Sequence, residues 1–155
     1  ALAAMDRQLN MAWSHRSPDS PLTDPYQALV LASIVEKETA APAERPEIAG
    51  VFARRLRRGM PLQTDPTVIY GLGEAFDGNL RRADLARDNP YNTYTRKGLP
   101  PTPIALPGVD ALAAAVNPAP GDALYFVATG QGGHVFSRTL DEHNRAVRQY
   151  QLKGK

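Results

Sequence analysis

The chain has 155 residues, of which 43% are hydrophobic and 22% are charged, a balance typical of a globular domain with one core. Its formal net charge of +2 is too small to indicate a nucleic-acid partner. The absence of cysteine excludes disulfides, thiolate zinc sites and a cysteine nucleophile. No apolar run approaches the ~20 residues of a membrane span.

Residues 1–22 are predicted to form a helix and a linker, ahead of a main domain at residues 23–152. Apolar side chains recur at helical spacing in the first part, and the Pro, Ser and Asp content of residues 15–25 is typical of a loop. The apolar face of this helix comprises Leu2, Met5, Leu9 and Trp13.

A second helix is predicted to begin at Pro25. Thr23 or Asp24 can cap its first turn, and proline suits the first helical position. Apolar residues then recur as expected of a helix packed into a core. They are Val30, Leu31, Ile34 and Val35.

Two glutamates end this helix, and they differ in position. At about 100° per residue, Glu38 extends the apolar stripe that contains Leu31 and Ile34, whereas Glu36 lies nearly opposite. Burial and the negative end of the helix dipole both disfavour a charged Glu38 and should raise its pKa. Glu38 is therefore a candidate general acid, although a solvated glutamate that ends a core helix fits the same spacing.

A third helix is predicted from Pro46 to a C-cap at Gly59. Its buried stripe comprises Ile48, Val51, Phe52 and Leu56. Four arginines are expected to cover its solvated outside rather than to form a polyanion site. They are Arg54, Arg55, Arg57 and Arg58.

Polar residues interrupt the apolar sequence after this helix. Gln63, Thr64 and Asp65 stand between apolar residues, so they either form a turn or line a cleft. Residues 62–70 have the composition of a strand or a short helix, and a short surface helix is expected at residues 80–87.

Residues 88–108 contain five prolines and are predicted to form a long ordered loop that packs on the body of the domain. Asn92 and Tyr94 in this loop offer hydrogen bonds and an aromatic face suited to sugars. Their pattern equally fits side chains that pin the loop in place. A short helix is expected at residues 109–116.

A β-hairpin is predicted near the end of the chain. Its strands are residues 123–128 and 134–137, joined by a glycine-rich turn. His134 lies on the second strand with no second histidine at metal-ligand spacing, so the pattern fits a structural or exposed side chain as well as a functional one. A polar amphipathic helix at residues 140–151 is expected to follow.

The sequence contains no Ser-His-Asp order, HExxH motif, P-loop or cluster of metal ligands. The candidate acids in apolar surroundings are Glu38 and Asp65. Glycoside hydrolysis normally uses two carboxyl groups, whereas one is enough when the sugar supplies its own nucleophile. The residues alone leave both possibilities open.

Five motifs follow one another in a stretch, residues 24–150, that as a whole resembles a known family. They are ASIVEKETAAPAERPEIAGVFARRL, LQTDPTVIYGLG, YNTYTRKGLPPTPI, NPA and ALYFVATGQGGHVFS. In this order they closely resemble the endolytic murein transglycosylases of the YceG-like family. The pair Glu38–Thr39 also resembles the catalytic glutamate and following hydroxyl residue of other lytic transglycosylases, which selects Glu38 over Glu36.

The resemblance implies cleavage of the β-1,4 bond between N-acetylmuramic acid and N-acetylglucosamine within peptidoglycan strands, leaving 1,6-anhydro-muramyl ends. Glu38 would act first as acid and then as base, without a cofactor or metal. The implied fold is α+β, with a helical body that carries the catalytic helix and a β-hairpin and long ordered loop that form a lysozyme-like glycan groove. The implied groove residues are Gln63, Thr64, Asp65, Asn92, Tyr94 and His134.

Members of this family usually carry a membrane helix and a small LysM-like domain ahead of the catalytic part, and neither is recognised in this sequence. We therefore expect an anchor outside it, the periplasmic face of the bacterial inner membrane as location, and peptidoglycan synthases as partners. Two alternatives stay open. One is a peptidoglycan hydrolase that uses Glu38 with Asp65, and the other is a non-catalytic glycan-binding or cell-wall scaffold module.

Overall fold

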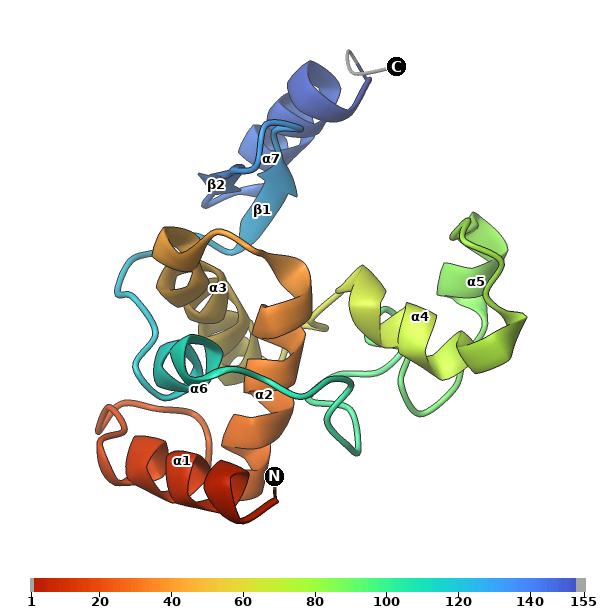
Figure 1. Ribbon diagram of the computed structural model, residues 1–155. Coiled ribbons are helices and arrows are strands. Elements are labelled where there is room, and N and C mark those ends of the chain that lie inside the picture. Colours follow the sequence, from red (N-terminus) through yellow and green to blue (C-terminus); the bar gives the residue numbers. More distant parts are fainter. Residues whose placement is uncertain (1, 153–155) are drawn as a thin grey trace.

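The computed structural model describes residues 2–152 and has the mixed α+β architecture that the sequence predicts (Figure 1). The helices are α1 (Leu2–Ser14), α2 (Pro25–Glu38), α3 (Arg45–Arg58), α4 (Asp65–Leu72), α5 (Arg82–Ala86), α6 (Val109–Val116) and α7 (Leu140–Val147). Shorter helical turns are η1 (Pro42–Glu44), η2 (Gly73–Ala75) and the π-helical η3 (Arg148–Leu152). Across residues 2–152, no helix combines the length and apolar character needed to cross a bilayer.

Helix α2 lies at the centre of the helical body, packed against α1, α3, α4 and α6 (Figure 1). Asp24 caps it as predicted, because its carboxylate accepts a hydrogen bond from the Gln27 amide at 2.9 Å. Pro25 occupies the first helical turn, and the Thr39 amide closes the last turn onto the Val35 carbonyl. The predicted start and end of this helix are therefore confirmed.

The hydrophobic core encloses the middle of α2. The stripe of Leu31, Ile34 and Val35 is fully buried, and so are Ala32 and the other small residues of the opposite face. The core continues into α3 and α6 with Ile48, Phe52 and Leu112. From α1, Met5, Leu9 and Trp13 pack against it as predicted, while the side chain of Leu2 lies outside the described part of the chain. The backbone of α2 is thus fixed up to its last residue.

Helix α3 begins with Pro46 in its first turn and ends at Gly59, whose φ of 68° is the left-handed conformation that glycine adopts at helix ends. Both ends agree with the prediction. The expectation that all four arginines are solvated is wrong for Arg55, which is only 5% exposed. Arg55 follows Phe52 by three positions and Val51 by four, so the helical period turns it toward the interior.

The segment around Asp65 is helical rather than extended. Asp65 and Pro66 open α4, with proline in the first turn where no amide donor is needed. The 88–108 loop contains no helix or strand and is ordered by packing, as predicted. One of its contacts with α2 is the hydrogen bond from the Ile104 amide to the Ser33 hydroxyl at 3.0 Å.

Strands β1 (Tyr125–Ala128) and β2 (His134–Ser137) form the predicted antiparallel hairpin, with Tyr125 opposite Ser137 and Ala128 opposite His134. Helix α7 packs on both strands, and Figure 1 shows this unit at one end of α3, beyond the C-terminal end of α2. The hairpin and α7 therefore form a wall beside Glu38.

Replacing Asp24 with Ala is expected to lower the free energy of unfolding by about 1 kcal/mol, because the first turn of α2 loses its side-chain cap. Urea denaturation measures this change. The control is Asp19→Ala, which removes an exposed aspartate whose side chain forms no hydrogen bond within residues 2–152. Equal losses in the two variants would contradict the capping role.

Candidate active site

A cleft of about 640 Å³ opens between the C-terminal end of α2, the N-terminal end of α4 and the wall formed by the hairpin and α7. Of the seven residues predicted from the sequence, five line it and two do not. Those that line it are Glu38, Gln63, Asp65, Tyr94 and His134. Thr64 and Asn92 are both buried, and neither lines the cleft.

The Glu38 carboxyl group lines the cleft at a position that disfavours its charged form. Loss of hydration raises the pKa of Glu38 to about 7, and the negative charge of Asp65 adds to the rise. The Thr64 hydroxyl acts in the opposite direction and lowers this pKa by a smaller amount. That hydroxyl forms no well-aligned hydrogen bond within residues 2–152. A carboxyl group that titrates near neutral pH can both give and take a proton there.

Glu36 occupies a different environment from Glu38. Its carboxylate accepts a hydrogen bond from the Gly108 amide at 2.7 Å and lies 3.8 Å from the Arg45 guanidinium. Glu36 is not among the residues that line the cleft. The two glutamates of the α2 terminus are therefore separated as the helical period predicts, with Glu36 engaged in holding the loop before α6.

Thr93 fixes the backbone that carries the polar segment before α4. Its carbonyl accepts a hydrogen bond from the Gln63 amide at 3.2 Å, and its hydroxyl accepts one from the Thr64 amide at 3.0 Å. Thr67 bonds the same hydroxyl at 3.0 Å. Gln63 has a φ of 53°, an uncommon conformation for a residue other than glycine. The buried threonines thus hold Gln63 and its neighbours at the edge of the cleft.

Tyr94 connects the loop to the acid at the start of α4. Its hydroxyl donates to the Asp65 carboxylate at 2.5 Å. Burial raises the pKa of the Tyr94 phenol, and the hydrogen bond to Asp65 raises it further. Tyr94 therefore remains a neutral donor at physiological pH, and Asp65 has one oxygen already engaged.

Asn92 does not line the cleft, and its side chain instead binds backbone groups of the loop to which it belongs. Its amide nitrogen donates to the carbonyls of Leu85 at 2.9 Å and Arg87 at 2.8 Å, at the end of α5. Its side-chain oxygen accepts the Tyr94 amide at 2.8 Å and the Thr95 amide at 3.1 Å. Asn92 thereby sets the backbone position from which Tyr94 reaches Asp65.

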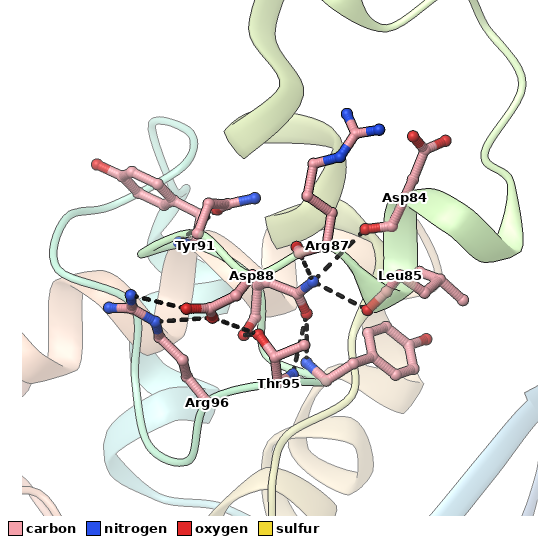
Figure 2. Close-up of polar contacts among 10 residues, drawn as sticks. Asp84, Leu85, Arg87, Asp88, Tyr91, Thr95 and Arg96 are labelled. Atoms are coloured by element: carbon pink, nitrogen blue, oxygen red, sulfur yellow. Dashed lines mark hydrogen bonds and ion pairs between the residues drawn. The ribbon is translucent and has the colours of Figure 1, made fainter.

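An ion pair supports the same turn from the outside. Figure 2 shows Asp88 facing Thr95 and Arg96, with bonds of 2.7 Å to the Thr95 hydroxyl and 3.0 Å to Arg96 Nε. These contacts hold the pKa of Asp88 at about 2, chiefly through Arg96. The turn from Asp88 to Arg96, which carries Tyr94, is thus closed by contacts within itself.

His134 faces the cleft from the start of β2 and is held by Glu44 of η1. The Glu44 carboxylate lies 2.8 Å from His134 Nδ1 and accepts the His134 amide at 3.0 Å. This contact joins the hairpin to the segment that directly follows α2. It fixes the distance between the hairpin wall and the helix that carries Glu38.

Among the cleft residues that the sequence analysis did not select are two basic ones, His143 and Arg55. His143 of α7 stacks on Tyr125 with ring centroids 5.0 Å apart, and burial followed by the charge of Arg55 lowers the His143 pKa. Arg55 also lines the cleft. The periodicity of α3 could have located Arg55, whereas no short-range signal points to His143. Within residues 2–152, no three acidic or histidine side chains gather as a metal-binding group.

Comparison with known proteins assigns the chain to a family. The model of the YceG-like family matches residues 1–149, and the chain belongs to this family. A crystal structure of a YceG-like protein from Listeria monocytogenes superposes with a TM-score of 0.76 at 41% identity, covering 93% of this chain and 44% of that one.

Two curated relatives are named endolytic murein transglycosylase. The Bacillus subtilis protein is 47% identical over 125 residues, covering 81% of this chain, and the Streptococcus pneumoniae R6 protein is 36% identical over 154 residues, covering 96%. The chain spans 34% and 28% of the lengths of these relatives.

Asp65→Asn is expected to lower the pKa of Glu38 below about 7, because it removes a nearby negative charge that disfavours the Glu38 carboxylate. The titration of the Glu38 side-chain carboxyl carbon, followed by ¹³C NMR, measures the change. Asp77→Asn, at an exposed site outside the cleft, is the control. A Glu38 pKa that stays unchanged or rises in Asp65→Asn would contradict the proposed coupling.

Glu38→Gln is expected to stabilise the protein relative to wild type at pH 8 more than at pH 4. The pKa of Glu38 in the folded protein, about 7, exceeds the ordinary glutamate value of 4.5, so the wild type loses stability as pH rises through this interval. The gain at pH 8 should be about 1–3 kcal/mol, reduced by the partial exposure of the side chain. Denaturant titration at both pH values measures it, with the exposed Glu74→Gln as control. An identical gain at both pH values would rule out the pKa assignment.

Proposed function

We propose that this chain is the catalytic part of an endolytic peptidoglycan lytic transglycosylase, with Glu38 as its acid and base. The observation that carries the proposal is a carboxyl group with a pKa of about 7 in a cleft, at the end of a buried helix. The names of the curated relatives support the same reaction class.

Protonated Glu38 first donates its proton to the oxygen of the β-1,4 bond between N-acetylmuramic acid and N-acetylglucosamine. The bond between that oxygen and C1 of the muramyl residue then breaks. The Glu38 carboxylate next takes the proton from the muramyl C6 hydroxyl, whose oxygen attacks C1 and closes the 1,6-anhydro ring. Glu38 ends the cycle protonated and no water is consumed, so one group with a pKa near neutrality can perform both steps.

The other cleft residues support this role in distinct ways. Asp65 keeps the Glu38 pKa high through its negative charge, and Tyr94 holds Asp65 in place. Gln63 and His134 present polar groups to the cleft, where they would bind the glycan. Thr64 would adjust the pKa of Glu38, and Asn92 would hold the loop that carries Tyr94.

A hydrolase that uses Glu38 with Asp65 is the second candidate, because both carboxyl groups line one cleft. In that case Asp65 would activate water or attack C1, and the product would carry a reducing end. The hydrogen bond from Tyr94 occupies one Asp65 oxygen, which favours the electrostatic role over a nucleophilic one.

The proposal extends to the setting of the enzyme. Residues 23–152 would form the catalytic domain, with residues 1–22 as a supporting helix and linker. The complete protein would be anchored at the periplasmic face of the inner membrane, act on peptidoglycan strands and work beside peptidoglycan synthases.

Mass spectrometry of products from purified glycan strands tests the reaction. Wild type should yield anhydro-muramyl ends, and Glu38→Gln should lower their rate of formation by about 10²–10⁴-fold, because the acid and base are lost. Glu36→Gln is the matched control, since it changes the neighbouring glutamate that holds Gly108. Reducing ends, heavier by one water, would favour the hydrolase. An active Glu38→Gln together with an inactive Glu36→Gln would refute the choice of glutamate.

A further inference from the structure

Arg55 is a buried cation in the wall of the cleft. Its side chain leaves α3 at a position that faces the core and is only 5% exposed, yet it lines the same cleft as Glu38. Its Nε donates to the Leu124 carbonyl at 2.7 Å and its Nη1 to the Pro61 carbonyl at 2.6 Å. The guanidinium also lies over the Tyr125 ring, 4.8 Å from the ring centroid. Two backbone carbonyls and the Tyr125 ring therefore hold the guanidinium group in one position.

No anion within residues 2–152 neutralises this charge. The ion pairs of the described chain do not include Arg55, and its hydrogen bonds go to neutral backbone carbonyls. The Nη2 group makes no hydrogen bond there and is not sealed from solvent. Burial lowers the Arg55 pKa, and the groups that act against this are two tyrosines rather than a carboxylate. An unpaired buried cation is costly, and proteins usually bury arginine beside an acid.

Its neighbour Arg54 makes the contrast plain. Arg54 also donates to backbone carbonyls, at Ala119 and Ala123, and so ties α3 to the segment before β1 in a similar way. It has the acidic neighbour Asp122 and does not line the cleft. An arginine of α3 can therefore hold backbone carbonyls without placing an unpaired charge in the cleft. Arg55 differs because its charge is unpaired and lies in the cleft wall.

We propose that Arg55 forms a carboxylate-binding subsite in the cleft, where its unpaired Nη2 donors bind an acidic group of the substrate. The Nη2 group carries two N–H donors, and a positively charged donor forms a stronger hydrogen bond with a carboxylate than with a neutral acceptor. This inference rests on the proposed function, because peptidoglycan strands supply such groups. The source is either an acidic residue of the peptide stem or the lactyl carboxylate of a muramyl residue whose stem has been removed.

The subsite gives Arg55 a role in substrate selection, separate from the acid–base chemistry of Glu38. A neutral glycan would leave the guanidinium unpaired on binding, whereas an acidic one would neutralise it. Because the ring of Tyr125 and two carbonyls fix the guanidinium, little conformational freedom is lost when the carboxylate arrives. The cleft would thus favour strands that carry a carboxylate over uncharged sugar chains.

Binding to the 155-residue chain carrying Glu38→Gln, which prevents turnover, tests the subsite. Isothermal calorimetry would compare the affinities of three kinds of glycan strand. The first carries peptide stems, the second is stem-free with free lactyl carboxylates, and the third is stem-free with amidated lactyl groups. Adding Arg55→Gln should weaken binding of the carboxylate-bearing strands at least tenfold and leave the amidated strands within twofold. Adding Arg55→Lys should restore part of the loss. A loss confined to strands with stems assigns the carboxylate to the peptide, and a loss with stem-free acidic strands assigns it to the lactyl group.

Arg54→Gln is the matched control, since it also removes hydrogen bonds from α3 to backbone carbonyls. It should leave the preference for carboxylate-bearing strands intact. Weakening of all three strands by equal factors in Arg55→Gln, or the same loss in Arg54→Gln, would overturn the subsite and leave Arg55 a structural residue. Equal binding of carboxylate-bearing and amidated strands would count against the subsite alone. The products formed by the wild type test the proposed reaction separately. No binding of any strand would count against both.

Discussion

The loss of hydration at the end of α2 is the constraint on which the proposed chemistry depends. A carboxyl group in water would be ionised at neutral pH and useless as an acid. The middle of helix α2, from Val30 to Val35, is buried in the core, and this packing fixes the last turn that carries Glu38. The same packing that stabilises the core therefore keeps the Glu38 pKa near 7.

Other residues that line the cleft with Glu38 come from segments far from α2 in the sequence. Asp65 comes from the first turn of α4, Tyr94 from the long loop, and His134 from the hairpin. Thr93 fixes the backbone before Asp65 and Glu44 fixes His134, in each case from a distant segment, while Asn92 fixes Tyr94 from within the same loop. The cleft is thus assembled by long-range contacts between elements that are each simple in themselves.

The sequence predicts the local structure of this chain well, because helix caps, prolines and periodicity act over a few residues. Asp24, Pro46 and Gly59 mark helix ends in the structure as their chemistry dictates. The separation of Glu36 from Glu38 follows equally from the helical period.

Features that depend on distant contacts are less accessible to sequence reasoning. Asn92 reads as a sugar-binding residue, but its partners are backbone groups whose positions depend on the fold of the loop. His143 enters the cleft only because α7 packs back on the hairpin. Arg55 is an intermediate case, because its position on the buried stripe was readable while its charge argued for solvent. The charge of Arg55 predicts an exposed side chain, which is wrong, whereas the helical period predicts a buried one.

The five prolines of the 88–108 loop have a further consequence for how Tyr94 is presented. Proline restricts the backbone of the unfolded chain, so less conformational entropy is lost when such a loop becomes ordered. The contacts of Asn92 and Ser33 then fix the loop during folding, before any ligand is present. Under the proposed function, a glycan would meet a preformed aromatic surface in the cleft, and no free energy would be lost in ordering that part of the wall. A long irregular segment can in this way be as rigid a part of a binding site as a helix.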